Sequence, residues 1–124
     1  MQLTEHQPGN HHVIRRTEAN AVWVDDQRFE QSLLVGARLL RNDWPVHHFD
    51  DLDDEALEPL FALGPELVLL GIGQRQQILP PALQRRFLEH GIGLECMTLP
   101  AACRTFNVLM SENRRAVAAL ILPG

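Results

Sequence analysis

The stretch from residue 94 to residue 122 constrains the fold of this chain more than any other. A short apolar run leads into Thr98, Leu99 and Pro100. Thr accepts a bond from a free helix N–H and Pro needs none in the first turn, so this order predicts a helix start at Thr98. Apolar residues then recur with helical spacing and predict one buried face: Leu99, Ala102, Cys103, Phe106, Leu109 and Met110.

The end of this helix and the run that follows are equally informative. Asn113 tolerates the left-handed conformation that closes many helices, and two arginines follow it. Residues 116–122 are apolar without interruption, which is typical of a strand that is covered on both faces. Residues 94–122 therefore predict a strand, a helix and a second strand.

Earlier segments continue this alternation. We expect helices at residues 50–64 and 80–90, and strands at residues 66–70 and 92–96. Pro59 lies inside the first of these helices and is expected to kink or shorten it. Helices and strands in alternation predict an α/β fold, with helices covering the sheet through right-handed crossovers.

The first third of the chain predicts strands rather than helices. Apolar and β-branched residues favour an antiparallel meander with strands at residues 12–16, 21–24 and 28–35. Residues 44–46 suggest one more short segment, and Pro45 favours an edge position for it. We expect residues 1–10 to be a poorly ordered tail.

Composition limits the domain count and the function. At 124 residues the chain is expected to be a single domain, residues 1–124. A net charge of −5 argues against nucleic-acid binding. Two cysteines make no disulfide framework. No apolar signal core or membrane span is apparent, so a cytoplasmic location is the simplest expectation.

The Gly71-Ile72-Gly73 turn follows a predicted central strand and invites comparison with nucleotide-binding loops. The dinucleotide fingerprint requires a third Gly three residues on, and this chain has Gln76 there. A tight turn at the end of the strand is the favoured interpretation. An anion site made of backbone N–H groups is the alternative.

The sequence assigns no metal, cofactor or catalytic residue. The acidic run at residues 50–55 lacks the spacing of a calcium loop and suits a capped helix start. Adjacent histidines on a strand point to opposite faces, so the two His-His pairs make no natural metal site. Cys103 falls on the apolar helix face, which indicates a buried thiol rather than a nucleophile.

A set of polar residues on and after the last helix is the best candidate for a site. We expect the first half of this helix to face the Gly71–Gly73 turn across a shallow pocket, because ligands favour the carboxyl ends of strands in open α/β sheets. In the alternative, Arg104 pairs with an acidic neighbour and Asn107 caps a loop. The candidate pocket or interaction surface comprises Gly71, Gly73, Arg104, Thr105, Asn107, Glu112 and Arg114.

These motifs resemble a known family. The Gly71-Ile72-Gly73 turn, the run 105–109 and the run 112–120 are similar to domain-of-unknown-function family 498. That family includes a mitochondrial assembly factor of respiratory complex I. Two positions depart from its pattern: Asn113 replaces a usual Gly, and Phe106 replaces a common Tyr and so lacks its hydroxyl.

The resemblance implies both a fold and a function. The expected fold is a three-layer α/β arrangement around a mixed central sheet, with a small N-terminal antiparallel β layer. The expected function is that of a binding or assembly protein, with subunits of a respiratory or membrane complex as partners. The alternatives are an enzyme or small-molecule-binding protein that uses the Gly71–Gly73 pocket, and a structural domain that acts only as an oligomer.

Overall fold

Two β-sheets form the frame of the molecule. A computed structural model describes residues 11–123. A three-stranded antiparallel sheet has the order β1-β2-β3, and a five-stranded mixed sheet has the order β5-β4-β8-β6-β7. Their strands are β1 Ile14–Glu18, β2 Ala21–Val24, β3 Gln27–Phe29, β4 Leu33–Val35, β5 Leu40–Arg41, β6 Leu67–Ile72, β7 Gly93–Met97 and β8 Ala116–Ile121.

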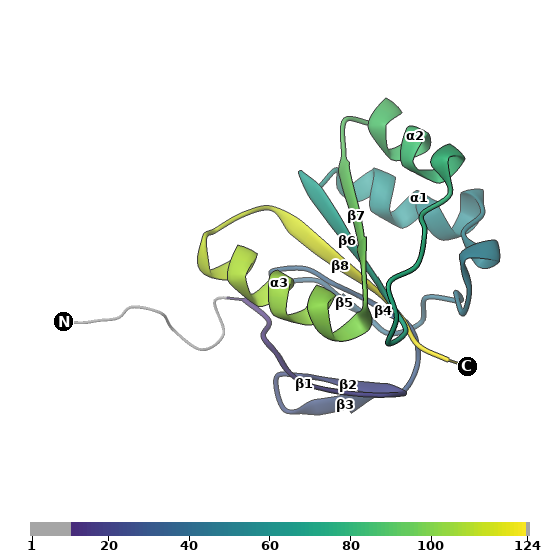
Figure 1. The fold of residues 1–124 in the computed structure, drawn as a ribbon. Coiled ribbons are helices and arrows are strands. Elements are labelled where there is room, and N and C mark those ends of the chain that lie inside the picture. Colours follow the sequence, from purple (N-terminus) through teal and green to yellow (C-terminus); the bar gives the residue numbers. More distant parts are fainter. Residues whose placement is uncertain (1–10, 124) are drawn as a thin grey trace.

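Three α-helices cover the five-stranded sheet on its two faces. Figure 1 shows α3 between the two sheets, with α1 and α2 on the far face of the larger one. The helices are α1 Asp54–Leu63, α2 Pro81–Glu89 and α3 Leu99–Ser111. The predicted three-layer α/β arrangement with an additional small N-terminal β layer is confirmed.

The central strand β8 explains the unbroken apolar run. It pairs in parallel with β6 and antiparallel with β4, and each of its residues is buried. Ala118 and Leu120 belong to the core beneath α3, whereas Val117, Ala119 and Ile121 belong to the core beneath α1 and α2. The prediction that this strand is covered on both faces is confirmed.

Both ends of α3 form as the sequence predicts. The Thr98 hydroxyl accepts a hydrogen bond from the Ala101 N–H at 3.3 Å, and the Leu99 N–H donates to the Gly73 carbonyl at 2.8 Å. Asn113 has a φ of 59°, which is the left-handed conformation expected at the helix end. Local sequence therefore determines where this helix begins and ends.

The single strand expected at residues 28–35 is wrong. Two strands, β3 and β4, occupy this stretch and belong to different sheets. Ser32 lies between them and is fully buried. Its hydroxyl oxygen accepts from the Leu122 N–H at 2.9 Å and donates to the Val46 carbonyl, so it ties three segments together. A buried polar link of this kind has no signature in apolar periodicity.

The expected edge strand at residues 44–46 is also wrong. Trp44 and Val46 are buried against the α1 side of the sheet without strand pairing. The Trp44 indole N–H donates to the Ala56 carbonyl of α1 at 2.9 Å. This segment therefore packs through its side chains, which apolar content alone does not distinguish from a strand.

The helix predicted at residues 50–64 is divided. A 3-10 turn at Phe49–Asp51 precedes α1, and Asp53 is the N-cap, accepting from the Ala56 N–H at 2.9 Å. Pro59 lies inside α1 and does not end it. The carbonyl that loses its helical partner belongs to Glu55, which is exposed and accessible to water. The expected tail at residues 1–10 lies outside the described residues.

We expect Gly71→Ala to destabilise the protein by about 1–3 kcal/mol, because the close approach of α3 leaves no room for a side chain. A Cβ at Gly71 would lie 2.6 Å from the Ala102 Cβ. Urea unfolding of the variant measures the loss. The double variant Gly71→Ala/Ala102→Gly is the control, since Gly71→Ala should cost less in the Ala102→Gly background. An equal cost in both backgrounds would contradict the proposed clash.

Candidate functional site

The Gly71–Gly73 turn lies at the carboxyl end of β6, next to the carboxyl end of β7. The chain continues from these two strands to opposite faces of the sheet. The chain after β6 leads to α2 on one face, and the chain after the neighbouring β7 leads to α3 on the other. Such a switch point is where α/β sheets commonly bind ligands. Here two hydrogen bonds bridge it: Leu99 N–H to the Gly73 carbonyl at 2.8 Å, and Gln76 Nε2 to the Cys96 carbonyl at 2.9 Å.

Direct packing replaces the pocket expected between α3 and this turn. Gly71 is buried, and its Cα approaches Ala102 so closely that a Cβ would overlap it. The predicted shallow space is therefore filled at the level of Gly71. The physical reason is that two residues with small or absent side chains allow the helix to lie directly on the strand.

The start of α3, which lies beside the Gly71–Gly73 turn, adds no free backbone donors to the anion site considered for that turn. The N–H of Leu99 bonds to Gly73, Pro100 has none, and the next two N–H groups bond to Thr98. A helix N-terminus attracts anions through N–H groups that lack partners. The first turn of α3 has its donors occupied by the chain itself.

Asn107 has a structural role. Its side-chain oxygen accepts from the Ile14 N–H at 3.0 Å, and its Nδ2 donates to the Ile14 carbonyl at 2.8 Å. These two bonds fasten the first residue of β1 to α3 in the way that a neighbouring strand would. The alternative in which Asn107 caps a loop is close to this arrangement, although the segment it holds is a strand.

Arg104 differs from the other polar residues of α3. It is exposed and makes no hydrogen bond or ion pair with any residue of the described range 11–123. The alternative in which it pairs with an acidic neighbour is therefore wrong among these residues. Val108, one turn further along, is 54% exposed although it is apolar. We call the exposed edge of the helix the α3 surface, comprising Arg104, Thr105, Val108, Ser111 and Glu112.

The remaining predicted residues lie near the end of α3. Arg114 pairs with Glu66 at 2.8 Å between Nη2 and Oε2, and the hydrogen bond from Arg114 lowers the pKa of the Glu66 carboxyl. Glu112 is exposed at the C-cap. Thus Arg104, Thr105 and Glu112 share one helix edge, whereas Arg114 belongs to a groove at the opposite end of the sheet from Gly73.

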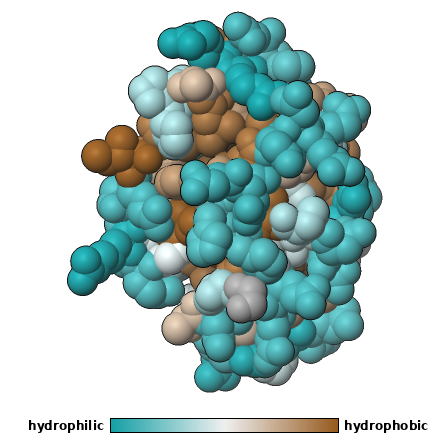
Figure 2. Space-filling view, turned by 90° about the vertical axis from the view of Figure 1, so that its right-hand side faces the viewer, coloured by the Kyte–Doolittle hydropathy of each residue, from teal (hydrophilic) through white to brown (hydrophobic). Residues whose placement is uncertain are grey.

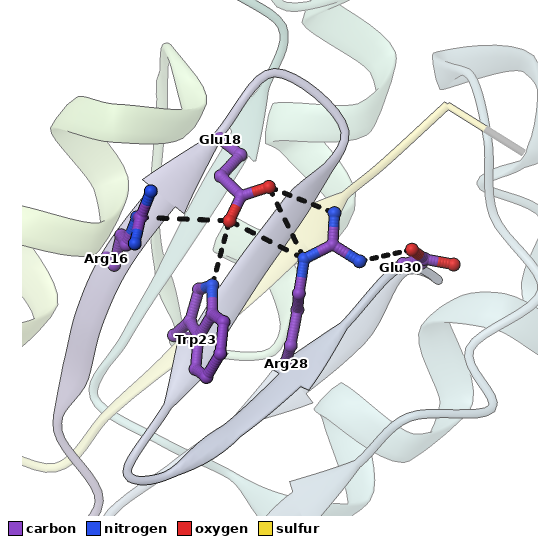
Figure 3. A network of polar contacts seen from close by, with 5 residues as sticks. All are labelled: Arg16, Glu18, Trp23, Arg28 and Glu30. Atoms are coloured by element: carbon purple, nitrogen blue, oxygen red, sulfur yellow. Dashed lines mark hydrogen bonds and ion pairs between the residues drawn. The ribbon is translucent and has the colours of Figure 1, made fainter.

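A charged network on the outer face of the three-stranded sheet was not predicted from the sequence. Figure 3 shows Glu18 at its centre, facing Arg28 and Trp23, with Arg16 and Glu30 at its margins. Arg28 Nη2 lies 2.9 Å from Glu18 Oε1, and the Trp23 indole N–H donates to Oε2 at 2.8 Å. The hydrogen bond from Arg28 and, to a smaller extent, that from Trp23 lower the pKa of Glu18 from 4.5 to about 2.

The described residues that could act as a nucleophile or as metal ligands are not arranged for either role. Cys103 is buried, and burial raises the pKa of its thiol to about 12, far from a reactive thiolate. Residues 11–123 contain no group of three or more His, Cys, Asp or Glu side chains placed to hold a metal ion. No helix within the same range is long and apolar enough to cross a membrane.

Exposed apolar residues are few and scattered. Figure 2 shows the side on which the C-terminus lies, where the surface is mostly hydrophilic and hydrophobic side chains emerge mainly in the upper half. The strongly exposed large apolar residues among those described are Leu63, Ile78, Leu88 and Val108. Sequence periodicity could have identified Val108, because it falls outside the apolar stripe of its helix.

The sequence is similar to a family of proteins and to several individual proteins. The family described as "Protein of unknown function (DUF498/DUF598)" matches residues 14–121. The bovine (Bos taurus) NADH dehydrogenase (ubiquinone) 1 alpha subcomplex assembly factor 3 is 38% identical over 122 residues, covering 90% of this chain and 66% of that protein. The Francisella tularensis "13 kDa major membrane protein" is 25% identical over 89 residues, covering 72% of each. The chain spans 43% of the Drosophila melanogaster assembly factor 3.

Solved structures share the fold. An NMR structure of a Xanthomonas campestris protein has a TM-score of 0.83 at 36% identity, covering 100% of this chain and 94% of that one. An NMR structure of a Bordetella pertussis protein, described as a Mth938-like domain, has a TM-score of 0.80 at 27% identity, with the same coverage of 100% and 94%. This chain and these two bacterial proteins therefore share the same arrangement of layers.

We expect Asn107→Ala to destabilise the protein by about 1–2 kcal/mol, because the variant leaves the Ile14 N–H and carbonyl without partners. Urea unfolding measures the loss, and hydrogen exchange at the Ile14 amide should become faster. Arg104→Ala on the same helix is the control and should change stability by less than about 0.5 kcal/mol. Equal effects of the two substitutions would contradict the structural role of Asn107.

The Glu18 network predicts a pH-dependent contribution to stability. The pKa of Glu18 is lower in the folded protein than its ordinary value of 4.5. Its stabilising contribution should therefore be complete above about pH 4.5 and disappear as the pH falls toward about 2. The measurement is the urea midpoint of the wild type and of Glu18→Gln between about pH 4.5 and pH 2. The two midpoints should converge at the low end of this range.

Glu58→Gln is the control for this measurement. Glu58 is exposed on α1 and makes no hydrogen bond or ion pair within residues 11–123. The urea midpoint of Glu58→Gln should stay close to that of the wild type throughout the pH range. A Glu18→Gln difference that is independent of pH would refute the role assigned to the Arg28 and Trp23 contacts.

Proposed function

The chain belongs to the family of proteins of unknown function DUF498/DUF598, and from this membership we propose that it is a binding protein that assists the assembly of a respiratory or other membrane complex. The observation that carries the proposal is the 38% identity to the bovine complex I assembly factor 3 over 90% of this chain. The matched region is most of the fold, so a surface of this fold is the natural place for the shared activity.

The chemistry of the described residues supports binding rather than turnover. Asn107 is committed to Ile14, Arg114 to Glu66, and Cys103 to the core. A catalytic site needs a nucleophile, base or acid within reach of a substrate. Residues engaged in this way hold the fold together and leave the exposed helix edge for recognition.

We place the partner contact on the α3 surface. Arg104 has no partner among the described residues, and Val108 exposes an apolar side chain one helical turn away. An arginine beside an apolar residue is typical of the energetically important centre of a protein interface. Thr105 and Glu112 would lie at its polar rim.

We also propose a cytoplasmic location. Cys96 and Cys103 are both free thiols, which a reducing compartment preserves. One similar protein, from Francisella tularensis, has a name that refers to a membrane. A cytoplasmic protein that binds a membrane complex from its soluble side accords with such a name.

The proposal predicts that a tagged form of the protein captures subunits of a respiratory or other membrane complex from an extract of its host. Arg104→Glu should reduce their recovery, as quantified by mass spectrometry, by about tenfold or more, because reversal of an interface charge opposes a complementary partner. The melting temperature of the variant should remain within about 2 °C of the wild type.

Arg85→Glu is the matched control. Arg85 is exposed on α2, on the other face of the sheet, and undergoes the same charge reversal. It should capture the same subunits as the wild type. Failure to enrich any such subunit, or equal losses with both variants, would count against a partner site on α3.

A further inference from the structure

A groove lies at the end of the central sheet where β8 begins, opposite the Gly71–Gly73 end. Five pieces of the chain surround it: His11, the β4–β5 loop at residues 36–39, the end of α1, the last turn of α3, and residues 113–117. Its volume is about 870 Å³. Sites for small molecules commonly have volumes of about 300–1,000 Å³.

Positive charge gathers at this groove although the whole chain has a net charge of −5. Arg38, Arg114 and Arg115 all line it. Two carboxylates, Glu66 and Glu112, act on Arg114. Glu66 also accepts from the backbone N–H of Arg115 at 3.2 Å. The excess positive charge therefore lies on the other two arginine side chains.

These two arginines differ in their freedom. Arg115 Nη1 donates to the Gly64 carbonyl at 3.0 Å, which fixes its side chain at the end of α1. Arg38 makes no hydrogen bond or ion pair with any residue between 11 and 123. Its guanidinium has two parallel N–H groups that match a carboxylate. Arg38 is thus the lining residue best suited to bind an external anion.

Apolar side chains form part of the lining of the groove. Leu39, Leu63, Met110 and Val117 all line it, and Leu63 is 47% exposed. The only aromatic ring among the lining residues is the His11 imidazole, and no Phe or Trp lines the groove. A ligand that suits both features has a single anionic group and an aliphatic body.

We propose that this groove binds a small amphipathic carboxylate, with the carboxylate at Arg38 and the aliphatic chain over Leu39, Val117 and Met110. A carboxylate matches the Arg38 guanidinium, which has no partner within residues 11–123. A phosphate monoester carries a higher charge, and the second arginine with excess charge, Arg115, is already held at the Gly64 carbonyl. This binding site is independent of the assembly function and shares only Ser111 with the α3 surface.

The test is a titration of the ¹⁵N-labelled full chain with sodium decanoate, followed by amide chemical shifts. Decanoate should produce saturable shifts at Leu39, Ala116 and Val117, which lie in or beside the groove. Acetate has the head group without the chain, and decyltrimethylammonium has the chain with the opposite charge. Neither should produce saturable shifts at these residues.

Two variants test the assigned positions. Arg38→Gln should weaken decanoate binding by at least about tenfold, since it removes the charged bidentate contact. Ala37→Trp should abolish binding by filling the groove from an exposed lining position. Arg104→Gln removes the same charge from the α3 surface and should bind decanoate as the wild type does.

Three outcomes would overturn the proposal. These are no saturable shifts with decanoate, equally strong binding of decyltrimethylammonium, or unchanged affinity in Arg38→Gln and Ala37→Trp. None of them bears on the capture of complex subunits, which depends on Arg104.

Discussion

The direct contact between α3 and β6 is the constraint on which the rest of the structure depends. Gly71 contributes no side chain and Ala102 only a methyl group, so the helix lies directly on the strand, with no room for a Cβ at Gly71. The opposite side of α3 packs under the three-stranded sheet. A helix between two sheets needs a broad apolar surface, which its six buried residues supply: Leu99, Ala102, Cys103, Phe106, Leu109 and Met110.

This packing decides which polar residues are available for function. Only one edge of α3 reaches solvent, and it carries Arg104 and Val108. Asn107 lies beside the three-stranded sheet and holds β1 in place through Ile14. The same packing brings the Leu99 N–H to the Gly73 carbonyl at the carboxyl end of β6. The groove lies at the other end of the sheet, and three arginines line it.

Local signals predicted individual elements well, and long-range contacts explain the failures. The caps of α3, the left-handed Asn113 and the two-sided burial of β8 all follow from neighbouring residues. The separation of β3 from β4 depends on Ser32, whose partners are Val46 and Leu122. Periodicity carries no information about such a contact, because its partners lie 14 and 90 residues away in the chain.

The sequence by itself determined the fold class, the family and the order of helices and strands after residue 50, because hydrophobic periodicity and helix caps are local properties. Only the tertiary structure decided the fate of the candidate site residues. It buried Gly71 under α3, committed Asn107 to Ile14 and left Arg104 without a partner among residues 11–123. It also brought Arg38 into the same groove as Arg114, which is 76 positions away in the sequence. Such neighbours arise from how helices and strands pack, which depends on shape and burial across the whole chain.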